Sequence, residues 1–162
     1  MHLGSMTIVT DGHRDGRALL SRLYAAHVGG TEPEIALSGQ GKPYFRNSAV
    51  HFSISHTKRH VFCVLSDRPV GIDAEELDRK IDLRLAEKIL SPKEYAQFQA
   101  APDPRLALLT FWVLKEAAAK ATGEGLRGYP NHTEFSLNDP RVSVMDGCLV
   151  AILEGEMLCQ PF

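Results

Sequence analysis

The sequence lacks a long apolar run and is poor in cysteine. No apolar stretch approaches the roughly 18 residues that a transmembrane helix needs, and the N-terminal residues have no apolar core of the kind found in signal peptides. The three cysteines, Cys63, Cys148 and Cys159, show neither disulfide nor zinc-motif spacing. An odd cysteine count without a secretion signal suits a reducing compartment, so we expect a cytoplasmic protein without membrane contact.

An excess of charge of one sign is also lacking. The 162 residues include 18 Lys and Arg against 20 Asp and Glu, which gives a formal net charge of −2. This balance gives no reason to expect a nucleic acid as a partner. A hydrophobic content of 44% and a charged content of 23% are ordinary for a globular protein, and the length allows one domain or two small packed halves.

Apolar periodicity and turn signals predict an α+β fold. Two hairpins are expected, one turning at Asp67-Arg68-Pro69 and one at Asp146-Gly147. Helices are predicted over residues 17–28, 83–90 and 105–121, with a further helix starting at 92. Strands are predicted over residues 6–10, 51–56, 61–66, 70–75, 133–137, 141–145 and 148–153.

A weak internal repeat indicates two similar halves. Residues 52–55 (FSIS) and 135–138 (FSLN) each open a predicted strand, and a long apolar strand follows each of them. No low-complexity segment or flexible linker separates the halves. We therefore expect two similar α+β lobes, residues 6–75 and 76–162, packed into one pseudo-symmetric unit.

Two carboxylates lie at one end of a predicted strand. Asp73 and Glu75 are two residues apart, so on an extended chain both side chains point to the same face. Two like charges repel unless a cation lies between them, and a few oxygen ligands on a rigid strand suit Mg²⁺. The alternative is a solvated acidic strand end.

The predicted helix over 105–121 has charged residues close to an aromatic one. Trp112, Glu116 and Lys120 follow at i, i+4 and i+8 on one stripe, and Lys115 lies about 100° round the axis from Glu116. These groups are expected on the same side of the helix. An ordinary surface ion pair between Glu116 and Lys120 is the alternative.

Three further segments have candidate functional residues. Gly41, Lys42 and Pro43 lie in a turned loop that a ligand could approach, although a plain turn explains them equally well. Ser55 and His56 end a strand before Thr57-Lys58-Arg59-His60, a hydroxyl, imidazole and cation cluster that suits a phosphate monoester. His56 and His60 are four residues apart, and such a pair alone is weak evidence for zinc.

Several short motifs stand in a fixed order along the chain. Ser91 and Glu94 within one of them also form a capping box, which alone explains Glu94 structurally. The motifs are Gly41-Lys42-Pro43, Phe52-Ser53-Ile54-Ser55-His56-Thr57, Gly71-Ile72-Asp73-Ala74-Glu75, Ser91-Pro92-Lys93-Glu94-Tyr95, Phe111-Trp112-x-x-Lys115-Glu116-x-x-x-Lys120 and Gly123-x-Gly125-Leu126.

In these motifs, over about residues 13–153, the chain resembles the 4′-phosphopantetheinyl transferases of the Sfp (surfactin-synthetase-activating) type. The resemblance implies transfer of the phosphopantetheine arm of coenzyme A to a serine of an acyl or peptidyl carrier protein, with release of adenosine 3′,5′-bisphosphate. It also implies two α+β lobes related by a pseudo-twofold, with coenzyme A in the cleft between them.

The resemblance also implies roles for single residues. The family's Mg²⁺ ligands fall on Asp73, Glu75 and Glu116. A proposed general base falls on Glu94, and an aromatic that shapes the pocket falls on Trp112. The coenzyme A contacts fall on Gly41, Lys42 and Pro43 near the adenine, on Ser55 and His56 at the 3′-phosphate, and on Lys115 and Lys120 at the phosphates, Lys120 also stabilising charge at the leaving group.

The sequence leaves two alternatives to a monomeric transferase. Longer family members have basic coenzyme A contacts ahead of the helix that here begins near Arg14, and these have no counterpart here. That difference motivates a non-catalytic module that binds coenzyme A or a carrier protein. In a trimeric holo-acyl-carrier-protein synthase, the Gly-x-Asp motif would lie near the N-terminus, whereas Gly71 and Asp73 lie mid-chain, so a monomer is expected.

Overall fold

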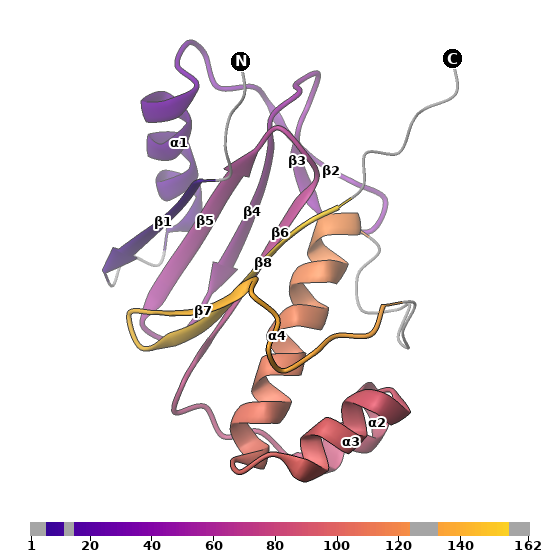
Figure 1. Cartoon of the computed structure of the whole chain (residues 1–162). Helices are drawn as coiled ribbons and strands as arrows, with labels where there is room; N and C mark the ends of the chain where they lie inside the picture. The colour runs from indigo at the N-terminus through magenta and orange to yellow at the C-terminus, as the bar shows by residue number, and fades with distance from the viewer. Residues whose placement is uncertain (1–5, 12–14, 124–132, 156–162) are drawn as a thin grey trace.

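The computed structural model describes residues 6–11, 15–123 and 133–155, and these form an α+β fold (Figure 1). The strands are β1 (Met6–Asp11), β2 (Ile35–Leu37), β3 (Pro43–Phe45), β4 (His51–His56), β5 (His60–Ser66), β6 (Val70–Glu76), β7 (Val142–Met145) and β8 (Cys148–Glu154). The helices are α1 (Gly16–His27), the 3₁₀ turn η1 (Leu83–Leu85), α2 (Ala86–Ile89), α3 (Pro92–Ala100) and α4 (Pro104–Thr122).

Two three-stranded antiparallel sheets form the framework. The first has the order β1-β5-β4 and the second the order β6-β8-β7. In both, the strand that comes last along the chain lies in the middle, and a long helix follows the strand that comes first. The short hairpin β2–β3 is a separate two-stranded sheet that projects the loop containing Lys42.

The period-two alternation of the central strands builds three apolar layers. On β5, Val61, Cys63 and Leu65 pack with α1, whereas Phe62 and Val64 face β6 and β8. The opposite faces of β6 and β8 pack against α4. The order of layers is therefore α1, first sheet, second sheet, α4.

Caps define where the helices start and stop. The predicted capping box is confirmed, since Glu94 N donates to Ser91 Oγ and Ser91 N donates to Glu94 Oε1. Asp103 caps α4, and Gly123 ends it in the left-handed region at φ 74°. Although α4 has 19 residues, neither it nor another helix in the described ranges is long and apolar enough to cross a membrane.

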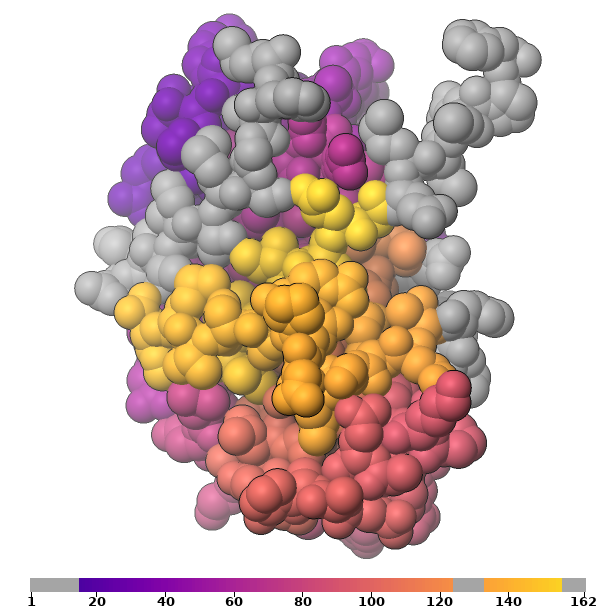
Figure 2. All heavy atoms as spheres, in the orientation of Figure 1, coloured from indigo at the N-terminus to yellow at the C-terminus, as the bar shows by residue number. Residues whose placement is uncertain are grey.

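Two sequence predictions are wrong. The turn at 67–69 does not close a hairpin, because β6 pairs with β8 and passes into the second sheet. The chain therefore passes from the first sheet to the second between β5 and β6. Residues 133–137 form no strand either. In Figure 2 the segment 133–155 covers the middle of the visible face, with α2 and α3 below it.

The other predicted strands and helices agree with the structure within a few residues, whereas Pro43, expected in a turned loop, begins the strand β3. The turn at Asp146 and Gly147 joins β7 to β8, with φ 48° and 73° at these two residues. This is the backbone conformation that an Asp-Gly hairpin adopts. The predicted helix over 83–90 begins as the 3₁₀ turn η1. The motif from Gly123 to Leu126 and the residue Cys159 lie partly or wholly outside the described residues.

Candidate active site

The site is built where β6 packs against α4 at very short range. A Cβ atom placed on Gly71 would lie 1.9 Å from the backbone oxygen of Ala117 and 2.5 Å from the nitrogen of Ala121, so only glycine fits there. Because side chains alternate along a strand, Asp73 and Glu75 face α4 like Gly71. The glycine thus allows the carboxylates to reach the charged residues of the helix.

Asp73 and Lys120 form the central contact. Lys120 Nζ donates to Asp73 Oδ1 at 2.8 Å and to the backbone oxygen of Ile72 at 3.0 Å. The Lys120 side chain is 32% exposed, whereas that of Asp73 is 9% exposed. Burial raises the pKa of Asp73, and the Lys120 ammonium opposes this. The pair has one side open to solvent.

Glu116 completes a cluster of acidic groups. Burial, followed by the nearby Asp73 charge, raises the pKa of Glu116 to about 7. Burial also raises the pKa of Glu75. Asp73 Oδ2 and Glu116 Oε1 are buried and have no hydrogen-bond partner among the residues that the structure describes. Two unpaired carboxylate oxygens near one another fit a hard divalent cation.

Glu75, the third carboxylate, has a cationic partner of its own. It forms an ion pair with Arg79, whose guanidinium lies over the Trp112 ring at 5.5 Å from the ring centre. Among the residues that the structure describes, the carboxylate oxygens of Asp73, Glu75 and Glu116 do not all lie within 4.8 Å of one another. The sequence analysis missed Arg79, and the i,i+4 spacing from Glu75 was no signal there, because Glu75 lies in a strand and not in a helix.

Two serines of β4 attach β6 to the first sheet. The backbone nitrogen of Ile72 donates to Ser53 Oγ, and that of Ala74 donates to Ser55 Oγ, each at 3.1 Å. Ser55 Oγ also donates to Asp73 Oδ1 at 3.5 Å. Ser55 is buried, and its hydroxyl positions β6 and Asp73; its contact with a phosphate stays a prediction.

A pocket of about 150 Å³ joins two of the predicted segments. It is lined by Gly41 and Lys42 from the loop before β3 and by Glu116 and Lys120 from α4. Lys42 Nζ donates to the backbone oxygens of Val70 and Ala121, at 3.3 Å each. Burial lowers the pKa of Lys42. Lys42 thus links the loop to β6 and α4.

Two further pockets contain other predicted site residues. One of about 280 Å³ contains Lys42 and Pro43. The other, about 800 Å³, extends from the exposed His56 to Glu75 and Arg79 and includes Lys58. The structure therefore brings Gly41, Lys42 and Pro43 together with the C-terminal end of α4, and brings His56 beside Glu75.

Glu94 and Lys115 lie away from these pockets. Lys115 Nζ donates to Glu94 Oε1 at 2.8 Å, and their side chains are 3% and 0% exposed. Lys115 Nζ also lies 5.7 Å from the centre of the Phe135 ring. The prediction that Lys115 shares a side of the helix with Glu116 and Lys120 is therefore wrong. Glu94 and Lys115 thus form a buried ion pair, and their roles as base and phosphate contact stay predictions.

A family model for the 4′-phosphopantetheinyl transferase superfamily matches residues 69–148, which include Asp73, Glu75 and Glu116. The transferase psf-1 of Bacillus pumilus is 41% identical over 91 residues, 54% of this chain and 39% of that protein. The transferase Sfp of Bacillus subtilis strain 168 is 32% identical over 115 residues, 68% of this chain and 49% of that protein.

The holo-[acyl-carrier-protein] synthase of Cronobacter sakazakii is 35% identical over 88 residues, 48% of this chain and 70% of that protein. The chain therefore belongs to the 4′-phosphopantetheinyl transferase superfamily, and the predicted Sfp-type resemblance is confirmed. It spans half or less of the length of psf-1 and of Sfp.

Proposed function

We propose that this chain transfers the 4′-phosphopantetheine group of coenzyme A to a serine of an apo acyl or peptidyl carrier protein and releases adenosine 3′,5′-bisphosphate. The observation that supports this most is the open Asp73–Lys120 pair, with Glu116 beside it and pockets on both sides. Family membership supports the same chemistry.

In this proposal Asp73, Glu75 and Glu116 hold Mg²⁺. The two unpaired buried oxygens of Asp73 and Glu116 fit this ion, and Glu75 would have to exchange Arg79 for it. When bound, Mg²⁺ neutralises negative charge on the phosphoryl oxygens of a pyrophosphate.

The cationic side chains of the chain supply binding and charge stabilisation. Lys120 is the one placed to contact a phosphate beside Asp73, because its ammonium is partly exposed in the groove. Gly41, Lys42 and Pro43 would contact the adenine end of coenzyme A, and His56 its 3′-phosphate. Glu94 and Lys115 have a supporting role, as their burial keeps them from the substrate.

The two sheets are proposed to be the cores of two lobes related by a pseudo-twofold, with the active site in the cleft between them. The shared strand order supports this arrangement. The lobes would divide near 67–69, where the chain passes from β5 to β6. A monomeric state and a cytoplasmic location complete the proposal.

The test is Mg²⁺-dependent transfer of a labelled coenzyme A arm to a panel of apo carrier proteins, followed by mass spectrometry of the carriers. Asp73→Asn is expected to lower the rate by about 10²–10³ without loss of fold. Asp82→Asn, at the exposed cap of η1, is the matched control and should transfer at the wild-type rate.

Transfer to no member of a broad panel would refute the transferase proposal. Calorimetric binding of coenzyme A without any product would instead support the non-catalytic binding module.

A further inference from the structure

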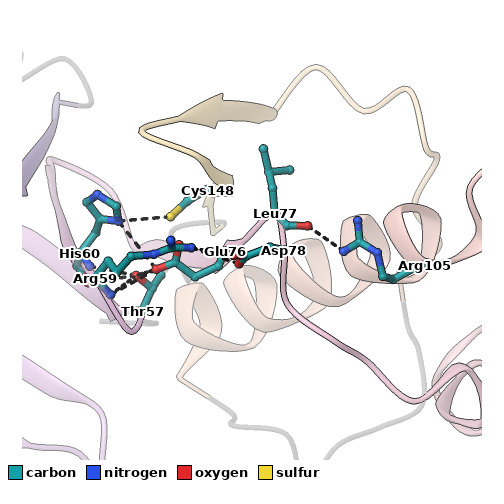
Figure 3. Close-up of polar contacts among 8 residues, drawn as sticks. All are labelled: Thr57, Arg59, His60, Glu76, Leu77, Asp78, Arg105 and Cys148. Atoms are coloured by element: carbon teal, nitrogen blue, oxygen red, sulfur yellow. Dashed lines mark hydrogen bonds and ion pairs between the residues drawn. The ribbon is translucent and has the colours of Figure 1, made fainter.

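A second cluster of ligand-type side chains lies where both sheets meet. His60 is the first residue of β5, Glu76 the last of β6 and Cys148 the first of β8. Figure 3 shows the three side chains converging from these strands. Each offers one ligand atom, and the three atoms lie within 4.8 Å of one another. The proposed Mg²⁺ site does not use His60, Glu76 or Cys148.

The distances match those within a tetrahedral metal site. One nitrogen, His60 Nδ1, lies 3.6 Å from Cys148 Sγ and 3.7 Å from Glu76 Oε1. With metal–sulfur bonds near 2.3 Å and metal–nitrogen or metal–oxygen bonds near 2.1 Å, tetrahedral angles place sulfur about 3.6 Å and oxygen about 3.4 Å from the nitrogen. A small closing of the His60–Glu76 separation satisfies this geometry.

Hydrogen bonds from Thr57 and Arg59 hold the Glu76 carboxylate in place. Glu76 Oε1 accepts hydrogen bonds from Thr57 Oγ1 at 2.7 Å and from Arg59 N at 3.1 Å, and Arg59 also binds Oε2 and Asp78. Glu76 is therefore an oriented oxygen donor, like hydrogen-bonded ligands at known metal sites.

The mixture of ligands selects the metal. Sulfur, imidazole nitrogen and a single carboxylate oxygen suit a borderline-soft ion such as Zn²⁺, whereas Mg²⁺ prefers oxygen alone. Cys148 is fully buried and His60 is half-buried. The ion would displace the thiol proton of Cys148, which goes to solvent as the metal–sulfur bond forms.

We propose that His60, Glu76 and Cys148 form a binding site for one Zn²⁺-like ion, with a fourth position left for water or an external ligand. Thr57 and Glu76 line the pocket of about 800 Å³, which provides the access. The ion would join β5 of the first sheet to β6 and β8 of the second. Its role is to fasten the two sheets together beside the proposed active site.

The test uses Co²⁺ as a spectroscopic substitute, with Mg²⁺ in excess to occupy carboxylate sites and with Cys159→Ser to remove the cysteine outside the described residues. One equivalent of Co²⁺ is expected to produce a thiolate-to-cobalt charge-transfer band. Cys148→Ser should abolish the band. Cys63→Ser is the matched control, because Cys63 is buried on the α1 face of β5, and it should keep the band.

Thermal unfolding provides a second measurement. Zn²⁺ should raise the Tm of the parent protein and of Cys63→Ser but not that of Cys148→Ser or His60→Gln. His60→Gln keeps the assay informative if Cys148→Ser fails to fold. Absence of the band, or a band that persists in both Cys148→Ser and His60→Gln, would overturn the proposal. Neither readout depends on transferase activity.

Discussion

Two lysine–carboxylate pairs anchored on α4 have the same chemistry but differ in access to solvent. Lys115 with Glu94 and Lys120 with Asp73 both have N–O distances of 2.8 Å. The first pair is 3% and 0% exposed, and the second is 32% and 9% exposed. The difference arises from the neighbouring element, which is α3 for Glu94 and the edge strand β6 for Asp73.

The two ion pairs suit different roles, one in holding the fold together and one in binding a ligand. A sealed pair can only keep its partner, so Lys115 and Glu94 fix α3 against α4. An open pair can exchange its partner for a ligand, as Lys120 does in the proposed mechanism when it contacts a phosphate. Distance and residue type therefore do not distinguish the two roles, whereas exposure does.

The largest effect is expected from breaking the sealed pair. Lys115→Met leaves the Glu94 carboxylate buried without its cation, and the free energy of unfolding should fall by about 3–5 kcal/mol. The rate of transfer per folded molecule should change little, because neither group lines the proposed pockets. Urea denaturation with an activity assay on the same sample measures both quantities.

The double variant Lys115→Met with Glu94→Gln is the control. It removes both charges and keeps an oxygen to accept from Ser91 N, so most of the lost stability should return. If Lys115→Met abolished transfer in a protein that stayed folded, the assignment of this pair to support would fail.

The open pair should behave in the opposite way. Lys120→Met is expected to lower the transfer rate by about 10²–10³, because it removes a cation beside the reacting phosphates. Stability should change less than in Lys115→Met, since the Lys120 side chain is partly exposed and Asp73 keeps the hydrogen bond from Ser55. If Lys115→Met and Lys120→Met lost equal stability and neither lost transfer rate, the assignment of different roles to the two pairs would be contradicted.

The sequence correctly predicted those features that depend on residues close together along the chain. Ser91 and Glu94 are three residues apart, and Asp146-Gly147 forms a two-residue turn, so sequence determined both the capping box and the β7–β8 hairpin. The same holds for α1 and α4, whose observed ends differ from prediction by about one residue. These features depend on contacts within a few positions of the chain.

Partners far apart along the chain were not predictable in this way. The strand pattern of 70–75 was correct, but β6 pairs with β8, more than seventy residues later, rather than with β5. The repeat of FSIS and FSLN also failed, because residues 135–138 lie outside any strand and the repeated unit is the sheet order itself. An alternating pattern indicates a strand without identifying its neighbour.

The apolar periodicity of the helix indicates the buried position of Lys115, although the prediction above did not use it. Leu108, Phe111 and Lys115 recur at i, i+3 and i+7 on one helix face, and both apolar members are fully buried. A lysine on a buried stripe requires a carboxylate partner. The cluster of His60, Glu76 and Cys148 had no comparable signal, since it forms only when the two sheets pack together.

The smallest effect concerns Glu116, the group beside the open pair. Its pKa is raised from 4.5 to about 7 in the folded protein, so the folded state holds the proton more tightly than the unfolded state. This stabilisation is complete below pH 4.5 and is lost as the pH rises through 7. Glu116→Gln has no such loss.

Without divalent ions, the free energy of unfolding of Glu116→Gln relative to wild type should therefore rise between pH 4 and pH 8. The expected rise is about 1–2 kcal/mol, less than the full shift implies because Glu116 is only half-buried and solvent screens it. Denaturant titrations in a chelator, with the exposed Glu87→Gln as the matched control, measure it. Saturating Mg²⁺ should reverse the difference at pH 8, because only the carboxylate can hold the ion; a difference that is flat with pH and insensitive to Mg²⁺ would remove Glu116 from the proposed site.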